Sequence, residues 1–210
     1  MKAFNSGCTD CGRLSQFLKD VKKEHPGYYC KPVPPFGDAG ARLLIVGLAP
    51  GKHGANASGR PFTGDFAGIL LYQTLHKFGF ATRPESVSAD DGLELRHCRI
   101  TNAVKCLPPE NKPLGAEINQ CNAYLAKELE AIGSDAIIIA LGTVAHQSVL
   151  KAKKLKLSAY KFGHCAEHRL PDGSLLIDSY HCSRYNTQTR RLTPGMFENV
   201  FELAQKRLKE

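Results

Sequence analysis

The chain has 210 residues, of which 28 are Lys or Arg and 20 are Asp or Glu, so its formal net charge at pH 7 is +8. A hydrophobic content of 42% suits one globular domain and excludes collagen-like and wholly disordered classes, and no apolar run reaches the ~18 residues of a membrane span. The charge favours an anionic partner, with nucleic acid as the first candidate and a membrane surface as the second. Of the two, we expect nucleic acid and no membrane.

Four short apolar runs predict buried strands. Each is followed within a few residues by glycine, proline or a polar side chain, which is typical of a strand end. The expected strands span residues 43–48, 99–104, 136–141 and 175–180. The stretch 28–40, ahead of the first strand, is rich in proline and glycine and predicts an irregular connector.

Stripes of apolar residues at helical spacing alternate with these strands. The expected helices cover about residues 69–78, 118–132, 143–154 and 194–210, and Thr193 before Pro194 is a favourable helix start. Strands that alternate with helices predict an α/β fold, a parallel sheet with helices on both faces. Ligands bind beyond the carboxyl ends of such strands. A site is therefore expected among residues 49–66, 102–113, 142–146 and 181–194.

Eight cysteines form a second pattern. Because no signal peptide is visible, we expect a reducing cytoplasm, where cysteines are more often free thiols or metal ligands than disulfides. Cys8 and Cys11 form a C-x2-C pair, Cys106 follows an expected strand, and Cys121 lies on the next expected helix. Four thiolates from these positions suit either zinc or a [4Fe–4S] cluster, and the alternative is a set of buried apolar thiols.

The segment 47–65 contains five glycines. Glycines let a ligand approach the backbone and its amide donors. The order G-x4-G-K-[ST] is absent, which excludes a nucleotide phosphate loop. Asp65 closes the segment at an expected helix start. It is either a charge that stabilises the helix N-terminus or a carboxylate directed at a ligand or a catalytic water.

Two other polar segments also follow expected strands. Residues 181–194 contain three arginines among Ser, Thr, Asn and Gln, which suits contacts with phosphates. His181 opens this segment, either as a structural histidine or as a donor to an anion. In residues 101–113, the amides of Asn102 and Asn111 suit base reading or water binding, or else turn structure.

Several motifs together resemble a known family. They are GLAPG-x-HG from Gly47, GRPFTGD from Gly59, T-N-A-V-K-C-x-PP-x-NKP from Thr101 and H-x-SR-x-NTQT-x-RLTP from His181. With the four cysteines and the connector PVPPFGD, they resemble the type 5 (class b) uracil-DNA glycosylases over nearly the whole chain. The resemblance implies a single domain over residues 1–210. It also implies a three-layer α/β/α sandwich around a four-stranded, mainly parallel sheet.

The resemblance also implies roles for individual residues. As catalytic residues it implies Asp65 and Asn111, near the attacking water, and His181, at a uracil carbonyl oxygen. The implied substrate-binding residues are Ala49, Gly51, His53, Gly54, Phe62, which stacks on the flipped base, and Asn102. We expect DNA contacts from Ser183, Arg184, Asn186, Thr187, Gln188, Arg190 and Arg191. The implied ligands of a structural [4Fe–4S] cluster are Cys8, Cys11, Cys106 and Cys121.

These expectations describe a monofunctional DNA glycosylase of base excision repair. It would hydrolyse the N-glycosidic bond of uracil, and of other deaminated bases such as hypoxanthine, without a lysine nucleophile. We expect a monomer whose partner is DNA containing such bases. The alternative is a non-catalytic nucleic-acid-binding protein with a structural metal site. That alternative explains the charge and the cysteines, but not Asp65, His181 and two asparagines placed after strands.

Overall fold

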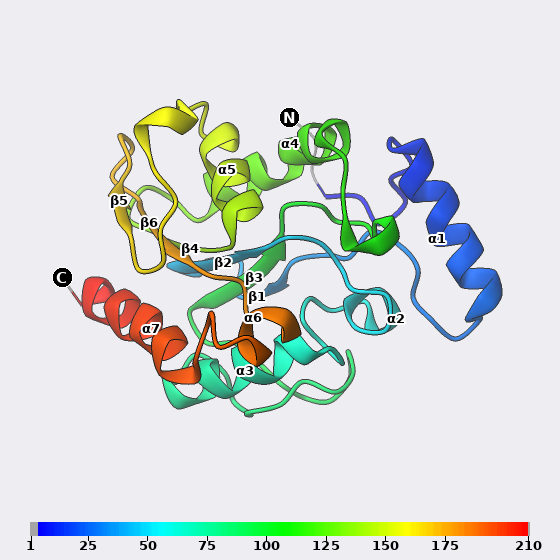
Figure 1. The fold of residues 1–210 in the computed structure, drawn as a ribbon, viewed down its shortest axis with the longest axis horizontal. Coiled ribbons are helices and arrows are strands. Elements are labelled where there is room, and N and C mark those ends of the chain that lie inside the picture. The colour runs from blue at the N-terminus through cyan, green and yellow to red at the C-terminus, as the bar shows by residue number, and fades with distance from the viewer. Residues whose placement is uncertain (1–3, 210) are drawn as a thin grey trace.

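The computed structural model describes residues 4–209, and its centre is a sheet with helices on both faces (Figure 1). Within this part of the chain the sheet has six strands, in the order β1-β3-β2-β4-β6-β5. The four central strands run parallel to one another. They are β3 (Cys98–Asn102), β2 (Leu43–Gly47), β4 (Ile137–Leu141) and β6 (Leu175–Ser179). The predicted α/β class is confirmed, and the ends of each predicted strand lie within two residues of those of an observed one.

The expected number of four strands is corrected by a short antiparallel strand at each edge of the sheet. β1 (Phe36–Gly37) pairs with β3, and β5 (Glu167–Arg169) pairs with β6. Strands of two and three residues are too short to show an alternating pattern in the sequence. β1 also lies inside the connector 28–40, which was expected to be irregular.

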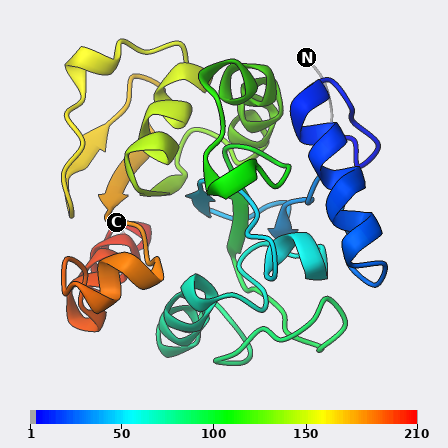
Figure 2. The same ribbon diagram turned by 45° about the vertical axis from the view of Figure 1, so that its right-hand side comes forward.

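Two pairs of helices make the outer layers of the sandwich (Figure 2). α3 (Phe66–Lys77) and α7 (Pro194–Leu208) bury Leu43 and Ile45 on one face of the sheet. α4 (Gly115–Ala131) and α5 (Thr143–Ala152) bury Leu44 and Val46 on the other face. Because both faces of the parallel strands are covered, the two innermost strands, β2 and β4, are apolar at every position. This confirms the predicted three-layer arrangement.

Three further helices were not predicted. They are α1 (Gly12–Glu24), α2 (Ala55–Ser58) and α6 (Arg184–Gln188). α1 buries Leu14, Leu18 and Val21, which lie on one face at helical spacing. The expected N-cap of α7 is present, since the Thr193 side chain accepts a hydrogen bond from the backbone N–H of Met196 at 3.2 Å. Over residues 4–209, no helix combines the length and apolarity needed to cross a membrane.

Candidate active site

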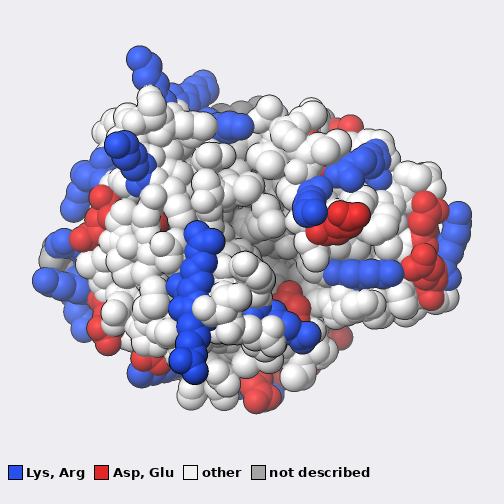
Figure 3. All heavy atoms as spheres, viewed as in Figure 1, with Lys and Arg blue, Asp and Glu red and all other residues white. Residues whose placement is uncertain are grey.

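A cavity of about 500 Å³ opens beyond the carboxyl ends of the parallel strands, where the fold class places ligands. All four central strands reach it: Ala49 follows β2, Asn102 ends β3, Leu141 ends β4 and His181 follows β6. Figure 3 shows this face hollowed near its centre, with mostly uncharged atoms inside and both basic and acidic side chains around the rim. Nine of the predicted residues line the cavity: Ala49, Gly51, Phe62, Asp65, Asn102, Asn111, His181, Ser183 and Arg184.

Asp65 is positioned by its place at the start of α3. Its Oδ1 accepts a hydrogen bond from the backbone N–H of Gly68 at 2.8 Å, which caps the helix. The same side chain lines the cavity, so the two interpretations of this residue from sequence are compatible. Burial against the apolar wall raises the pKa of Asp65, although N–H donors from Gly68 and Ala67 oppose the shift.

Gly54 packs directly against Asp65. A Cβ added to Gly54 would lie 2.5 Å from the Cβ and 2.6 Å from the Oδ2 of Asp65. Any larger residue would therefore displace the carboxylate. Gly54 lies behind Asp65 and is not among the residues that line the cavity. Its contribution to the site is therefore to leave space for the Asp65 side chain.

Two polar side chains on the cavity wall have atoms without a partner. Among residues 4–209, no donor or acceptor reaches the buried Nδ1 of His181 or the buried Oδ1 of Asn102. Buried polar atoms are nearly always hydrogen-bonded, so unpaired ones at a cavity indicate a site for a ligand or water. Burial lowers the pKa of His181 to about 4, which makes the imidazole neutral at neutral pH.

Phe62 forms an aromatic wall beside His181. The two rings are 28° from parallel with centroids 6.1 Å apart. A Cβ on Gly47 would lie 2.6 Å from Cζ of Phe62 and 2.4 Å from Oδ1 of Asn102. The glycine that ends β2 thus makes space for both side chains, because any side chain there would push them from the cavity wall.

Asn111 reaches the cavity from an unusual turn. It ends a single 3-10 turn, Pro109–Asn111, in which Glu110 and Asn111 have φ values of 54° and 56°. Residues other than glycine rarely adopt this left-handed conformation, and such strain is concentrated at functional sites. The turn lies between Cys106 and Cys121 in the chain.

The segment 183–191, expected as a loop, contains the short helix α6. The Ser183 side chain caps it through the backbone N–H of Asn186 at 3.4 Å. The Asn186 side chain donates from Nδ2 to the carbonyl oxygen of His181 at 2.8 Å, so it supports the histidine backbone. Arg191 lies over the ring of Tyr180, with its guanidinium carbon 4.8 Å from the ring centroid.

The other predicted residues lie outside the cavity. His53 is exposed, and its Nδ1 pairs with the hydroxyl of Tyr28 at 2.8 Å. Gln188 and Arg190 are exposed on the same segment as Arg184. Thr187 donates its hydroxyl to backbone oxygens within the segment, those of Ser183 and Arg184.

Sequence reasoning missed Arg60, a buried cation beside the site. Its guanidinium donates to Oδ1 of Asp91 at 2.8 Å and to the Ser86 hydroxyl at 3.0 Å, and it lies over the Phe36 ring. Although burial opposes the change, Arg60 and backbone donors lower the pKa of Asp91 to about 2. This pair fixes the GRPFTGD segment to the loop around residue 91. The only signal in the sequence was that Arg60 is the one basic residue of the GRPFTGD motif.

The four predicted ligand cysteines converge on a second, small cavity. Cys8, Cys11, Cys106 and Cys121 all line it, together with Leu14 of α1 and Tyr124 of α4. The backbone N–H of Lys105 donates to Sγ of Cys121 at 3.3 Å. Burial, and next the nearby charge of Cys121, raise the pKa of Cys11 to about 11 and that of Cys106 to about 12. The chain thus brings both halves of the predicted set together.

The fold and the main cavity define an α/β enzyme with a carboxylate, a neutral imidazole and two amides around one ligand site. A family model described as the uracil DNA glycosylase superfamily matches residues 34–205. A type-5 uracil-DNA glycosylase of Thermus thermophilus is 44% identical over 200 residues, which are 93% of this chain and 91% of that protein. A type-5 uracil-DNA glycosylase of Pyrobaculum aerophilum is 42% identical, over 94% and 87% of the two chains.

A type-4 uracil-DNA glycosylase of Archaeoglobus fulgidus is less similar, at 32% identity over 90% of this chain and 87% of that one. The chain therefore belongs to the uracil DNA glycosylase superfamily, and within it to the type-5 group. The resemblance noted in the sequence motifs is confirmed.

Proposed function

We propose that the protein excises uracil from DNA by hydrolysing the N-glycosidic bond, as a base excision repair enzyme. The observation that carries this proposal is the convergence of Asp65, Asn102 and His181 on one cavity at the carboxyl ends of the strands. Family membership supports the same reaction. A binding protein without catalysis has no need for a half-buried carboxylate beside a neutral imidazole.

The proposed reaction begins when DNA docks over the mouth of the cavity, beside the arginines of the segment 183–191. Arg184 lines the cavity and Arg190 is exposed nearby, which suits contacts with phosphates on either side of a flipped nucleotide. The base would lie against Phe62, and the amide of Asn102 would pair with its edge. This pairing would satisfy the buried amide oxygen that has no partner within residues 4–209.

Breaking the glycosidic bond leaves positive charge on the sugar and negative charge on the base. Asp65, with Asn111, would hold the attacking water and stabilise the sugar cation. His181 would donate a hydrogen bond to the departing base from a neutral imidazole. No lysine is among the described residues that line the cavity. This supports hydrolysis by water, without a Schiff base and without strand cleavage.

The decisive experiment incubates the protein with labelled duplex DNA that carries one uracil. We expect intact strands on a denaturing gel directly after the reaction, and cleavage at the uracil position only after alkali treatment. Cleavage without alkali would contradict the monofunctional mechanism. No cleavage after alkali would favour the alternative of a non-catalytic binding protein.

The proposal extends to other deaminated bases. A cavity of about 500 Å³ is within the range that accepts drug-sized ligands, so it has room for the two rings of hypoxanthine as well as for uracil. The same assay with hypoxanthine-containing DNA tests this. We further propose that the enzyme is a cytoplasmic monomer, with duplex DNA as its partner.

We also propose that Cys8, Cys11, Cys106 and Cys121 hold a [4Fe–4S] cluster. Four thiolates suit either this cluster or zinc, and the spacing of the sulfurs favours the larger group. In the described part of the chain, no three cysteine sulfurs lie within 4.8 Å of one another, whereas tetrahedral zinc holds its sulfurs about 3.8 Å apart. The cluster would serve structure, by joining α1 to β3 and α4.

Colour and composition test the cluster. Protein purified without oxygen should be brown, absorb near ~400 nm and contain about four iron and four sulfide per chain. A colourless protein with one zinc per chain would overturn this assignment.

Gly54→Ala should lower the rate of uracil excision by about 10²-fold, because the new methyl group would displace the Asp65 carboxylate. Single-turnover kinetics on uracil DNA measure this. Gly115→Ala is the matched control, since nothing lies within 4 Å of a Cβ at that position. Equal rates for the Gly54→Ala variant and the unmodified protein would show that the close contact does not position the carboxylate.

The pH profile of excision should have an acid limb only. His181, with a pKa of about 4, is neutral above that pH, and Asp65 becomes ionised once the pH exceeds its raised pKa. Both active forms are therefore lost as the pH falls, and neither is lost as the pH rises. A rate that declines as pH rises through about 6.5 would mean that the reaction needs an imidazolium. His181→Gln should lower the rate about 10²–10³-fold and leave the acid limb of Asp65.

A further inference from the structure

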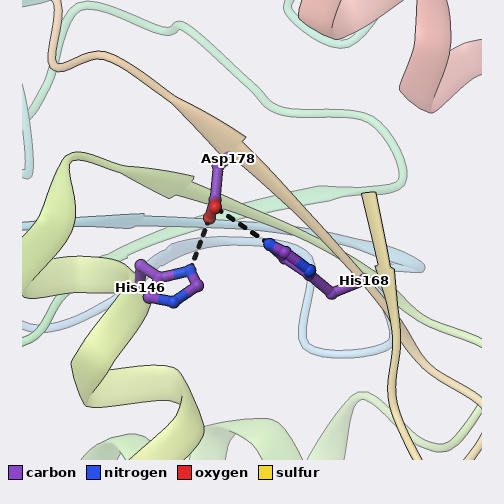
Figure 4. Close-up of side chains that lie close together, drawn as sticks. All are labelled: His146, His168 and Asp178. Atoms are coloured by element: carbon purple, nitrogen blue, oxygen red, sulfur yellow. Dashed lines mark hydrogen bonds and ion pairs between the residues drawn. The ribbon is translucent and has the colours of Figure 1, made fainter. Parts of the chain in front are cut away.

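Two histidines and an aspartate cluster outside the cavity, on the face of the sheet covered by α4 and α5 (Figure 4). His146 comes from α5, His168 from β5 and Asp178 from β6. Nδ1 of His146 lies 2.8 Å from Oδ1 of Asp178, and Nε2 of His168 lies 3.1 Å from Oδ2. The side chains of His146 and Asp178 are only 3% and 0% exposed.

The buried carboxylate of Asp178 requires a positive charge nearby, because an unpaired ion in a protein interior is costly. Its ion pairs within residues 4–209 are with the two histidines, and no lysine or arginine contributes. The backbone N–H of Gly163 also donates to Oδ2 at 3.3 Å, and a protonated imidazole or a bound metal ion can supply the compensating positive charge.

His146 is held so that one ring nitrogen is available as a metal ligand. Its Nε2 faces the carbonyl oxygen of Tyr160 at 3.1 Å, and a carbonyl can only accept, so Nε2 carries a proton. Without a metal ion, Nδ1 carries a proton that it donates to Oδ1 of Asp178, and although burial opposes the change, this contact raises the pKa of His146. A metal ion that takes the place of this proton would bind the lone pair of Nδ1. A histidine that donates one ring N–H to a backbone carbonyl and offers its other nitrogen to the metal is typical of metal sites. The ring is also enclosed by Phe162, with centroids 5.7 Å apart.

We propose that His146 Nδ1, His168 Nε2 and a carboxylate oxygen of Asp178 bind one divalent zinc ion. The three donor atoms lie within 4.8 Å of one another, and donors on a tetrahedral zinc lie about 3.3 Å apart. Small side-chain shifts suffice to close the site. Water takes the fourth position, and the 14% exposure of the His168 side chain provides access to solvent.

The ion would join α5 and the edge strand β5 to β6, three residues before His181. It would act on stability and not on the chemistry, because its ligands are not among the residues that line the active-site cavity. It would also account for two histidines gathered around a buried aspartate.

The test uses the complete protein with its cysteine site loaded, so that zinc cannot occupy the cysteines. After incubation with zinc and desalting, we expect one zinc per chain and a melting temperature raised by several degrees. His168→Gln keeps an N–H donor for Asp178 but removes the metal ligand, and should weaken zinc retention at least about 10-fold. His76→Gln, at an exposed position on α3, is the matched control and should behave as the unmodified protein.

X-ray absorption at the zinc edge of the unmodified protein provides a readout that does not depend on any variant. The proposal expects nitrogen and oxygen neighbours only. Sulfur neighbours, or no retained zinc, would overturn the proposal. So would a folded His168→Gln variant that retains zinc as well as the unmodified protein. An unchanged melting temperature after incubation with zinc would show that a proton, and not a metal ion, occupies the site.

Discussion

Asp65→Asn should lower the single-turnover rate of uracil excision by about 10²–10⁴-fold and leave the affinity for uracil-containing DNA unchanged. Asparagine is as good a helix N-cap as aspartate, so it keeps the hydrogen bond from the backbone N–H of Gly68. Only the negative charge in the cavity is removed. Rates from quenched reactions and affinities from fluorescence anisotropy separate the two effects.

The design of this variant isolates the chemical role of the residue. Asp65→Ala removes both the charge and the cap and should also destabilise the protein by about 1 kcal/mol. Asp90→Asn is the control, since it removes the charge of an exposed aspartate next to Asp91, and it should leave the rate of uracil excision unchanged. If Asp65→Asn retained nearly full excision, its carboxylate would be a helix cap alone and the proposed mechanism would fail.

The double substitution of Cys106 and Cys121 by serine should remove the iron, the brown colour and most of the folded protein. A structural metal site contributes on the order of 10 kcal/mol to folding, which is comparable to the entire stability of a typical domain. Both residues lie in the interface that joins α1 to α4. Iron analysis, absorbance and thermal melts by circular dichroism measure the outcome.

Cys165→Ser provides the control for this experiment. Cys165 is half-buried and packs against the opposite core, near Ala166 and β6, away from the cysteine cavity. It should keep the iron and melt within a few degrees of the unmodified protein. Unchanged melting of the double serine variant would mean that the cysteine site contributes nothing to stability.

The sequence predicts the central sheet well for a physical reason. β2 and β4 are covered on both faces, so every side chain in them is apolar and the runs stand out. α1 was missed although Leu14, Leu18 and Val21 recur at helical spacing among charged residues. Its N-cap residue, Cys11, makes no side-chain capping hydrogen bond, so no capping residue marks where the helix begins. α6 has five residues, fewer than two turns, which is too short for periodicity.

The site was partly predictable for a different reason. Side chains directly after parallel strands meet at one edge of the sheet, so Ala49, Asn102 and His181 were placed by topology alone. The ion pair of Arg60 with Asp91 links residues far apart in the chain, and no local pattern marks it. The left-handed backbone conformation of Asn111 could not be predicted from the sequence, because no glycine stands at that position.

The short strands at the two edges of the sheet also affect how the protein behaves at high concentration. An edge strand offers unpaired N–H and C=O groups to which another chain can add a strand. Here β1 has two residues and β5 three, and β5 carries the charged residues Glu167 and Arg169. Little backbone is left for a neighbouring molecule to pair with. The sheet is thereby protected against the edge-to-edge association that leads to aggregation.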